Sequence, residues 1–402
     1  MTVVLLAVPG LAQEPDLVLA APSRGVQVRR RCVDAADLLA AAATDPDAVI
    51  VVSPGLPRLS ADAVERMASG GRRLVGLAAD GSDADRLRAL GVVDIVLVGP
   101  TATATMEQLA VACAATGPAP VPSTGVWSTG VWSPPADPAQ DAAPQERGVL
   151  VAVWGPMGAP GRTTIAIGLA EVLAESGRRV CLVDADTYAP SVAMSLGIVE
   201  EACGLIVACR HADNGSLTPA ALHGLVRQVR PGWVVLGGLA RPDRWPDLRA
   251  GALDRVWSAC RESFDVTVVD VGFCLEDDES AGPWSRRRNA AALTALAVAE
   301  QVVAVADASA SGAARVAHAW SDLAERAPAA RLSLVRNRAG DQGRQWVDAV
   351  RSAGLPAPRR AVPRDDRALA SCWDRGRSLG EGARRSRVRR AVRELAAEVV
   401  GG

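Results

Sequence analysis

The sequence predicts an α/β protein of two domains, each built on a parallel β-sheet. Its 402 residues exceed one ordinary domain of roughly 100–200 residues. Short apolar runs rich in β-branched residues alternate with helical patterns on both sides of a stretch rich in Pro, Ala, Ser and Gly. With 49% hydrophobic and 22% charged residues, the chain can bury two cores. We predict domains at residues 1–116 and 148–402, joined by a linker at 117–147.

The first domain is predicted from five short apolar runs separated by helical patterns. Strands are expected at residues 3–8, 26–31, 48–53, 72–78 and 93–98. Helices are expected at residues 35–43, 60–69, 82–90 and 103–115. Five strands that alternate with helices in so short a segment are typical of a small doubly wound sheet.

This pattern resembles the CheY-like receiver fold, but its chemistry is missing. A working receiver needs an acidic pair after its first strand, a phosphoacceptor Asp ending the third and a Lys ending the fifth. The corresponding positions are Val8 and Pro9, Ser53, and Gly99. Without carboxylates there is no Mg²⁺ site, so the resemblance implies a pseudo-receiver that serves protein contact. An inert α/β spacer is the alternative.

The segment 117–147 is predicted to be a flexible, partly extended linker. Its composition cannot bury enough apolar area to offset the entropy of ordering. It contains a tandem STGVW repeat at residues 123–132. The two tryptophans of the repeat could contact a partner, or the repeat could be a neutral duplication.

The second domain is predicted to be a larger sheet of the same class. Strands are expected at residues 149–154, 180–184, 233–236, 266–270, 301–306 and 332–335, and a helix at 162–176 closed by Gly177. The first of these strands runs into the loop GPMGAPGRTT at residues 155–164, which leads directly into the helix. Free amide groups and the helix dipole make such a turn an anion site. We therefore expect a phosphate group there.

Acidic residues end two further strands of this domain. Asp184 and Asp186 end the strand at 180–184, and Asp270 ends the strand at 266–270. The loop itself is followed by Thr163 and Thr164. A threonine after a phosphate loop, with acids on neighbouring strand ends, is the arrangement that holds Mg²⁺ and a water beside a polyphosphate.

Together these motifs resemble the ParA/MinD class of deviant Walker ATPases, whose loop reads K-G-G-x-G-K-[ST]-T. The resemblance covers residues 148–402 and implies a P-loop nucleotide-binding fold that takes ATP and Mg²⁺. It implies that Asp184 and Asp186 are catalytic and that Thr163, Asp184 and Asp270 hold the metal. The nucleotide contacts implied in the same way are Gly158, Ala159, Gly161, Arg162, Thr163, Thr164, Asn337, Pro363 and Asp365.

The sequence departs from the family at its two lysines. Met157 replaces the signature lysine and Arg162 the P-loop lysine, and the chain contains no lysine at all. Pro156 and Pro160 cannot donate a backbone N–H, and each missing charge-assisted bond would cost roughly 1.5–3 kcal/mol. Arg162 offsets part of this cost because guanidinium grips phosphate in a bidentate fashion. We expect nucleotide binding with at most slow Mg²⁺-dependent hydrolysis.

A dinucleotide-binding Rossmann site is the alternative for the loop, since it also combines a glycine-rich turn with an acid about 20 residues later. Here, however, the glycines follow G-x-x-G-x-x-G. The paired threonines and the acid on a third strand have no task in binding NAD.

The C-terminal segment combines a basic surface with an apolar stripe. Eight arginines lie between residues 375 and 393, against the single acid Glu381. Val388, Val392, Leu395 and Val399 recur at helical spacing. Three interpretations are open: a helix packed on its own sheet, a membrane-surface helix, or a phosphate-binding patch for DNA. The short stripe favours packing.

Composition excludes several other classes. The longest apolar run, residues 290–306, is interrupted by Glu300 and Gln301, so a membrane span is not expected. The eight cysteines form no C-x-x-C pair, which argues against a disulfide framework or a structural zinc. The net charge of −1 provides no global attraction to nucleic acid. The N-terminus lacks a basic secretory leader, so we expect a cytoplasmic protein.

The combination of degenerate receiver, linker and deviant Walker domain resembles the CpaE/TadZ subgroup. The GAPGRTT loop and the stretch VDVGFCLEDDE look most like the septum-site-determining proteins of high-GC Gram-positive bacteria. The resemblance implies a nucleotide-dependent homodimer acting in septum-site determination or in Flp/Tad pilus localisation. Its expected partners are septum or pilus proteins and the inner face of the membrane, with DNA less expected. A non-catalytic scaffold is the alternative.

Overall fold

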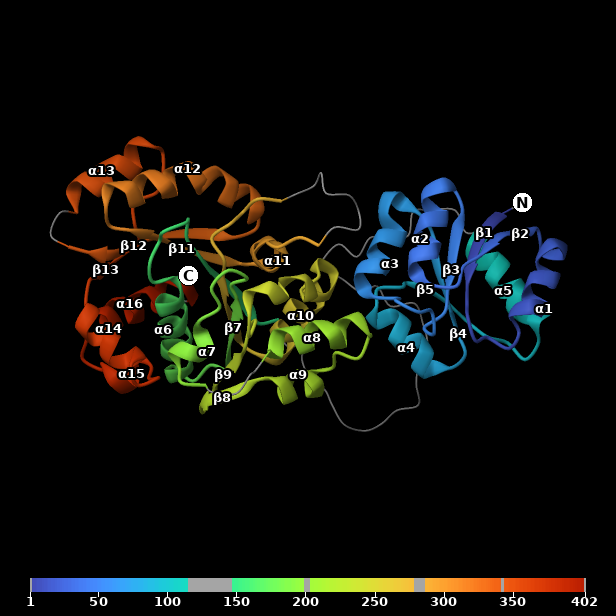
Figure 1. Ribbon diagram of the computed structural model, residues 1–402, viewed down its shortest axis with the longest axis horizontal. Coiled ribbons are helices and arrows are strands. Elements are labelled where there is room, and N and C mark those ends of the chain that lie inside the picture. Colours follow the sequence, from blue (N-terminus) through green and yellow to red (C-terminus); the bar gives the residue numbers. More distant parts are fainter. Residues whose placement is uncertain (1, 115–146, 199–202, 278–285, 341–342, 401–402) are drawn as a thin grey trace. The chain divides into compact units, whose positions relative to one another are not determined.

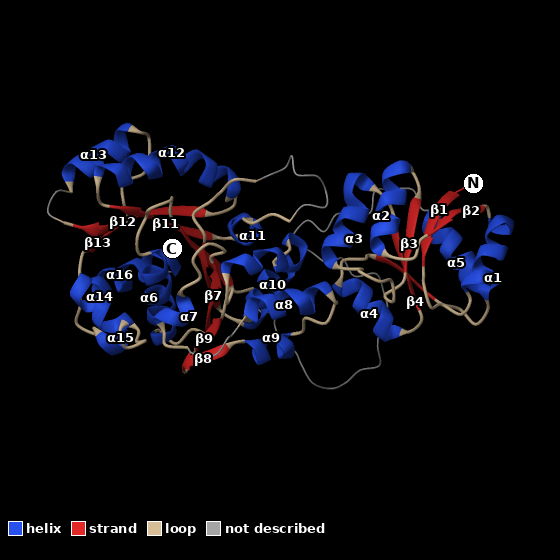
Figure 2. Cartoon of the chain, in the orientation of Figure 1, coloured by secondary structure: helices blue, strands red, loops and turns tan. Residues whose placement is uncertain are grey.

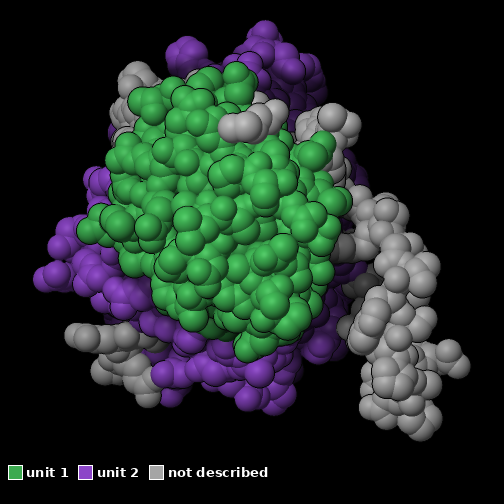
Figure 3. All heavy atoms as spheres, turned by 90° about the vertical axis from the view of Figure 1, so that its right-hand side faces the viewer, with its two compact units in different colours: residues 1–146, 213–216 green, residues 147–212, 217–402 purple. Residues whose placement is uncertain are grey.

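The computed structural model describes the chain except for residues 1, 115–146, 199–202, 278–285, 341–342 and 401–402 (Figure 1). The chain divides into two compact units, residues 1–146 with 213–216 and residues 147–212 with 217–402 (Figure 3). Nearly all of the predicted linker, including the tandem repeat at 123–132, lies outside the described residues. The predicted α/β class is confirmed in both units.

The first unit contains a five-stranded sheet in the order β2-β1-β3-β4-β5, in which every neighbouring pair is parallel. This is the flavodoxin-like order of doubly wound sheets. The central strand β3 is buried along its whole length. The strands are β1 (Thr2–Ala7), β2 (Val26–Arg31), β3 (Val49–Val52), β4 (Leu74–Ala78) and β5 (Asp94–Leu97).

Helices cover both faces of this sheet (Figure 2). They are α1 (Glu14–Ala20), α2 (Ala35–Thr44), α3 (Ala61–Ala68), α4 (Gly81–Ala89) and α5 (Ala102–Ala114), with 3₁₀ turns η1 (Ala21–Arg24) and η2 (Ser69–Gly71). The cores place α2, α3 and α4 on one face and α1 and α5 on the other. The sequence does not predict α1, because this helix buries only Leu17 and so shows no apolar stripe.

The second unit contains an eight-stranded sheet in the order β13-β12-β11-β6-β10-β7-β9-β8. All neighbours are parallel except β8 and β9. The strands are β6 (Val149–Trp154), β7 (Val180–Ala185), β8 (Arg227–Arg230), β9 (Trp233–Leu236), β10 (Val266–Val271), β11 (Gln301–Asp307), β12 (Arg331–Ala339) and β13 (Arg360–Pro363). The sequence does not predict the edge strands β8 and β13, because their four-residue arginine-containing segments lack an apolar run.

Two helical layers cover the larger sheet (Figure 1). One core joins α6, α14, α15 and α16 to the sheet, and the other joins α8, α10, α11, α12 and α13 to the opposite face. The helices of this unit are α6 (Arg162–Glu175), α7 (Val192–Ser195), α8 (Gly204–Asp213), α9 (Pro219–Leu225), η3 (Pro242–Asp247), α10 (Ala250–Ser263), α11 (Ala290–Val298), α12 (Ala310–Arg326), α13 (Arg344–Ser352), α14 (Asp366–Trp373), α15 (Leu379–Gly382) and α16 (Arg387–Val400).

The apolar stripe of α16 packs inside the second unit. Its four residues, Val388, Val392, Leu395 and Val399, are at most 2% exposed. A Cβ on Gly168 of α6 would stand 3.0 Å from Val392, so the two helices are closely packed there. Of the three interpretations of this segment, the packed helix is the one the structure contains. In this packing the stripe is not available to a lipid surface.

None of the described helices is both long and apolar enough to cross a membrane. All eight cysteines are free thiols, and six of them are buried. Burial raises the pKa of the Cys113 thiol to about 12, so this side chain is a core residue rather than a reactive nucleophile.

Candidate functional site

The predicted phosphate loop lies at the end of a central strand. Strand β6 is flanked by β10 and β11, and the chain turns directly from it into α6. Gly158 and Gly161 take left-handed φ values of 73° and 90°, which favour glycine. Gly161 is the N-cap of α6 and has no side chain to satisfy the first amides of the helix. The loop therefore presents unfilled donors at a helix N-terminus.

Arg162, at the position of the P-loop lysine, folds back over the loop. Its Nη2 lies 3.2 Å from Oδ2 of Asp186, and its Nη1 donates to the carbonyl of Gly155 at 3.3 Å. The side chain is 16% exposed and that of Asp186 is 4% exposed. The two form a mostly buried ion pair at the mouth of the loop.

The three predicted acids meet at one edge of the sheet. Strand β10 lies between β6 and β7, and the strand register places Asp270 directly opposite Asp184. Counted over the whole residue, Asp184, Asp186 and Asp270 are between 1% and 3% exposed. Parallel strands end at the same side of a sheet, which explains why positions some 85 residues apart converge.

Asp184 and Asp186 accept hydrogen bonds from backbone amides, whereas Asp270 accepts none from the part of the chain that the structure describes. Asp184 Oδ2 accepts from the amides of Ser191 and Val192 at 2.9 and 3.0 Å, and its Oδ1 accepts from the amide of Asp186 at 3.3 Å. Asp186 Oδ1 accepts from the amides of residues 188 and 189 at 2.8 and 3.1 Å. Both acids therefore order the chain that follows β7.

Asp270 is buried, and the Thr163 hydroxyl lies near its carboxylate. Neither carboxylate oxygen accepts a hydrogen bond of good geometry from the described residues. Burial and the nearby Asp184 carboxylate raise the pKa of Asp270 well above its usual range, while Thr163 and Arg162 oppose the rise. Burial likewise raises the pKa of Asp184 to about 7, against the effect of its amide donors. A cation beside Asp270 would relieve the cost of burying its charge.

These residues fit a phosphate-bound Mg²⁺ better than a metal held by protein alone. In the part of the chain that the structure describes, no cluster of three or more His, Cys, Asp or Glu side chains could hold a metal ion. Mg²⁺ usually takes one or two carboxylates and completes its shell with water and phosphate oxygens. The open oxygens of Asp270 suit that role. The Thr163 hydroxyl lies 3.2 Å from the Ser191 hydroxyl, and Asp184 has no oxygen free of backbone donors.

Asn337 contacts the loop rather than an open pocket. Its Nδ2 donates to the carbonyl of Pro160 at 2.6 Å, and a Cβ on Gly161 would stand 2.3 Å from the same nitrogen. Pro363 ends β13, and Asp365 caps α14 by accepting from the amide of Ala368 at 3.2 Å. The structure brings Asn337 to the loop and gives Asp365 a capping role.

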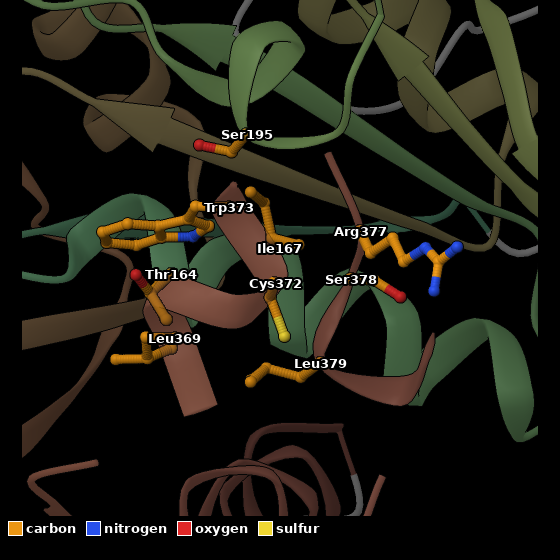
Figure 4. Close-up of a pocket in the computed structure, with 9 residues that line it drawn as sticks. All are labelled: Thr164, Ile167, Ser195, Leu369, Cys372, Trp373, Arg377, Ser378 and Leu379. Carbon is orange, nitrogen blue, oxygen red and sulfur yellow. The ribbon is translucent and has the colours of Figure 1, made fainter. Parts of the chain in front are cut away.

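Two further residues predicted to contact the nucleotide, Ala159 and Thr164, are buried inside the second unit. Ala159 is 6% exposed, and its amide donates to the carbonyl of Pro156 at 2.9 Å. Thr164 lines a small cavity together with Trp373 of α14 (Figure 4). The cavity volume of about 10 Å³ is enough for a single water at most. This cavity is therefore not the nucleotide pocket.

Arg315 of α12 is a loop contact that the sequence does not reveal. Its Nη1 donates to the carbonyls of Met157 and Gly158 at 3.3 and 3.4 Å. A Cβ on Gly158 would stand 2.4 Å from that nitrogen. Arg315 is one of many arginines on exposed helix faces, and no motif marks it. It places a second guanidinium at the loop where the family has its signature lysine.

Comparison with known proteins agrees with this geometry. Residues 151–372 match the family described as the CobQ/CobB/MinD/ParA nucleotide-binding domain. No curated protein sequence matches the chain significantly.

The solved structures that share the fold include the following three. A ParA family ATPase from Chlorobium tepidum TLS has a TM-score of 0.54 at 16% identity, covering 62% of this chain and 98% of that one. The cell division ATPase MinD of Pyrococcus furiosus has a TM-score of 0.50 at 19% identity, covering 63% and 98%. The septum site-determining protein MinD of Pyrococcus horikoshii OT3, solved with Mg-ADP, has a TM-score of 0.50 at 18% identity, covering 63% and 96%.

Proposed function

Because the chain belongs to the CobQ/CobB/MinD/ParA family of nucleotide-binding domains, we propose that residues 148–402 bind ATP with Mg²⁺ at the loop between β6 and α6. The observation that carries the proposal is the buried, unpartnered carboxylate of Asp270 beside Thr163 and the loop. A buried charge without a partner is costly. A phosphate-bound cation is the partner that this position lacks.

Each residue of the site has a proposed task. Asp270 and the Thr163 hydroxyl hold the metal, which when bound neutralises charge on the phosphate oxygens. The first amides of α6 and the Arg162 guanidinium bind the phosphates, for which Arg162 leaves Asp186. The resemblance implies catalytic roles for Asp184 and Asp186 and a metal-binding role for Asp184. Because their oxygens accept from amides of the segment after β7, we propose instead that both acids hold this segment in place. Gly158, Ala159, Gly161 and Thr164 shape the cradle, and Asn337, Pro363 and Asp365 flank the base.

We propose binding with at most slow hydrolysis. Met157 stands where the family's signature lysine would meet the transferring phosphoryl charge. Asp186, the acid best placed to orient a water, has both oxygens occupied. Arg315 does bring a guanidinium to this part of the loop, but its Nη1 is bonded to the carbonyls of Met157 and Gly158. The loss of the signature lysine therefore removes a main source of rate acceleration in phosphoryl transfer. Nucleotide state then acts chiefly as a switch between monomer and homodimer.

We further propose that the protein is a cytoplasmic positioning factor in septum-site determination or Flp/Tad pilus localisation. The fold shared with two MinD proteins of Pyrococcus, described as a cell division ATPase and as a septum site-determining protein, supports this class. Residues 1–116, whose sheet has the flavodoxin-like order and whose strand ends lack receiver acids, would contact septum or pilus proteins as a pseudo-receiver. Peripheral membrane contact would use a surface other than the buried stripe of α16, and DNA binding is less favoured.

Titration with a fluorescent ATP analogue tests the proposal, with and without Mg²⁺, while the mass of the protein is followed. We expect Mg²⁺ to strengthen binding in the wild type and in Asp265→Asn, which changes an acid at the other end of the β10 segment. In Asp270→Asn the effect of Mg²⁺ should vanish. Absence of binding at millimolar ATP, or equal binding by all three proteins with and without Mg²⁺, would refute the proposal.

The alternative is a scaffold that does not use nucleotide. Two contacts within the chain favour it, because they occupy groups that would otherwise bind nucleotide: Arg162 pairs with Asp186, and Asn337 bonds to the carbonyl of Pro160. If this alternative is correct, the mass of the protein and its capture of partners will be the same with and without ATP.

A further inference from the structure

A hollow lined by arginines lies at the β13 edge of the large sheet. Its residues, between 336 and 394, are far in the sequence from the phosphate loop. Its volume is about 760 Å³, within the range of small-molecule sites. Its walls come from β12, α13, β13 and α16. Five arginines and two acids line it: Arg336, Arg344, Arg351, Arg359 and Arg360, with Asp348 and Glu394.

The acids neutralise only part of this charge. Asp348 lies 3.8 Å from Arg351, and Glu394 lies 3.1 Å from Arg360. Within the described ranges, the side chains of the other three arginines have no ion pair or hydrogen bond. They are Arg336, Arg344 and Arg359. The hollow therefore carries an uncompensated positive charge.

Arg336 is the unusual member because it is buried. It is 8% exposed, and its Nε has no hydrogen-bond partner in the described part of the chain. Burying a guanidinium without a counter-ion costs several kcal/mol, so most buried arginines are paired. The position calls for an anion.

The guanidinium lies against the start of α13. A Cβ on Gly343, the N-cap of that helix, would stand 2.4 Å from Nη1 and 2.9 Å from Nη2 of Arg336. The N-terminus of a helix carries partial positive charge and unsatisfied amides. A cation packed there adds repulsion to the cost of burial, whereas an anion between the two would bind both.

We propose that this hollow binds a ligand with a terminal phosphate or pyrophosphate group, at a site separate from the phosphate loop. Guanidinium is suited to phosphate because it donates two parallel bonds. Arg336 sits where a terminal phosphate of a small molecule could enter. A duplex presents its phosphates on a convex backbone and would reach only the exposed arginines of the rim.

The site is also connected to the proposed nucleotide site through β12. Arg336 and Asn337 are adjacent in this strand and therefore point to opposite faces of the sheet. Leu334 belongs to the core on the α12 side and Val335 to the core on the α6 side, which places Arg336 with α13 and Asn337 with the loop. The pairing of β12 with β13 is irregular just after Arg336, and Arg338 has φ 55°.

Calorimetry with inorganic pyrophosphate in EDTA tests the proposal on the full chain. We expect two binding events in the wild type, one in the hollow and one at the phosphate loop. Arg336→Met should weaken the first by about 10- to 100-fold, as expected for loss of charge-assisted bonds, and Arg162→Ala should weaken only the second. Arg331→Met, an exposed position at the other end of β12, is the matched control and should leave both unchanged.

The two proposals fail in different ways. If the phosphate loop binds nothing, Arg162→Ala will change nothing while Arg336→Met still removes one event. If Arg336→Met binds pyrophosphate as the wild type does, the hollow is not the site and the inference is wrong. A DNA duplex that displaces pyrophosphate from the Arg162→Ala protein would also overturn the assignment to a small ligand.

Two further measurements distinguish loss of the binding site from loss of the fold. Without ligand, Arg336→Met should melt at or above the wild-type temperature, because it replaces an uncompensated buried charge by an apolar side chain. A lower melting temperature would mean that Arg336 serves the fold, and would overturn the proposal. The surface double variant Arg344→Gln/Arg359→Gln should also weaken pyrophosphate binding at the hollow, and wild-type affinity in this variant would contradict it.

Discussion

Arg315 shows how this chain places positive charge at its phosphate loop without lysine. Its bonds to the carbonyls of Met157 and Gly158 span about 158 positions in the sequence. Because the chain contains no lysine, the sequence indicated only that any side chain taking the place of the signature lysine had to be an arginine. Which arginine it was depended on the packing of α12 beside the loop.

We predict that Arg315→Ala loosens the loop without unfolding the protein. Amide hydrogen exchange in residues 155–161 should become faster, because two carbonyls lose their donor. The free energy of unfolding should change by less than about 1 kcal/mol, as for other exposed charged contacts. Arg326→Ala, on the same helix, is the control, and equal exchange in the two variants would contradict the role of Arg315.

A second prediction concerns the pH dependence of stability. The pKa of Asp184 is raised to about 7 by burial, so the folded chain holds a proton that the unfolded chain releases near pH 4. This contribution to stability is present at low pH and is lost as pH rises from about 4 to 7. Its slope is at most about 1.4 kcal/mol per pH unit.

Asp184→Asn should remove the contribution of Asp184 to the pH dependence of stability. Asp270, whose pKa is also raised, will still contribute. The free energy of unfolding in EDTA should therefore fall less steeply between pH 4 and 7 than in the wild type. Urea unfolding at several pH values measures it. The exposed acid Asp322 supplies a control, since Asp322→Asn should keep the wild-type slope. An unchanged slope in Asp184→Asn would show that Asp184 is ionised at low pH in the folded chain.

A buried carboxylate on helix α6 forms hydrogen bonds with the start of helix α15. Glu171 is 1% exposed; it accepts from the hydroxyl of Ser378 and, at 2.8 Å, from the amide of Gly380. Arg230 of the edge strand β8 lies 3.4 Å from Glu171 and 2.9 Å from Glu381. One network thus joins α6, α15 and β8.

We predict that Glu171→Ala lowers the free energy of unfolding by about 2–4 kcal/mol, because it leaves buried donors unsatisfied. Asp243→Ala should cost less, because the ion pair that Asp243 forms with Arg241 is at the surface, with side chains 66% and 70% exposed. Urea unfolding measured side by side will compare them. Equal losses would mean that the network contributes no more than a surface ion pair.

Each unit has cores of its own, which leads to a prediction for the entire chain. Two hydrophobic clusters belong to the first unit and two to the second. Calorimetric unfolding should therefore show two transitions. ATP with Mg²⁺ should raise the temperature of one only, by the linkage between binding and folding. A single transition that shifts as a whole would show that the units unfold together.

Patterns along the chain were sufficient to predict most of the strands. Strand β9 and the start of α6 lie where periodicity predicts them, because a buried strand needs a continuous apolar run. Strands β8 and β13 could not be predicted in this way, because an edge strand of four residues owes its existence to its neighbour. The stripe of α16 was visible in the sequence, but the surface that covers it was not.

The class of the fold, the glycine-rich loop and the order of acids along the chain can be predicted from local spacing and residue chemistry. The acid without a hydrogen-bond donor among the described residues, the arginine that reaches the loop and the arginine buried beside α13 become known only once the chain is folded. These properties depend on hydrogen-bond partners contributed by distant segments. The partners of Asp184 come from the turn after β7, whereas Asp270 has none among the described residues, and no spacing rule distinguishes the two.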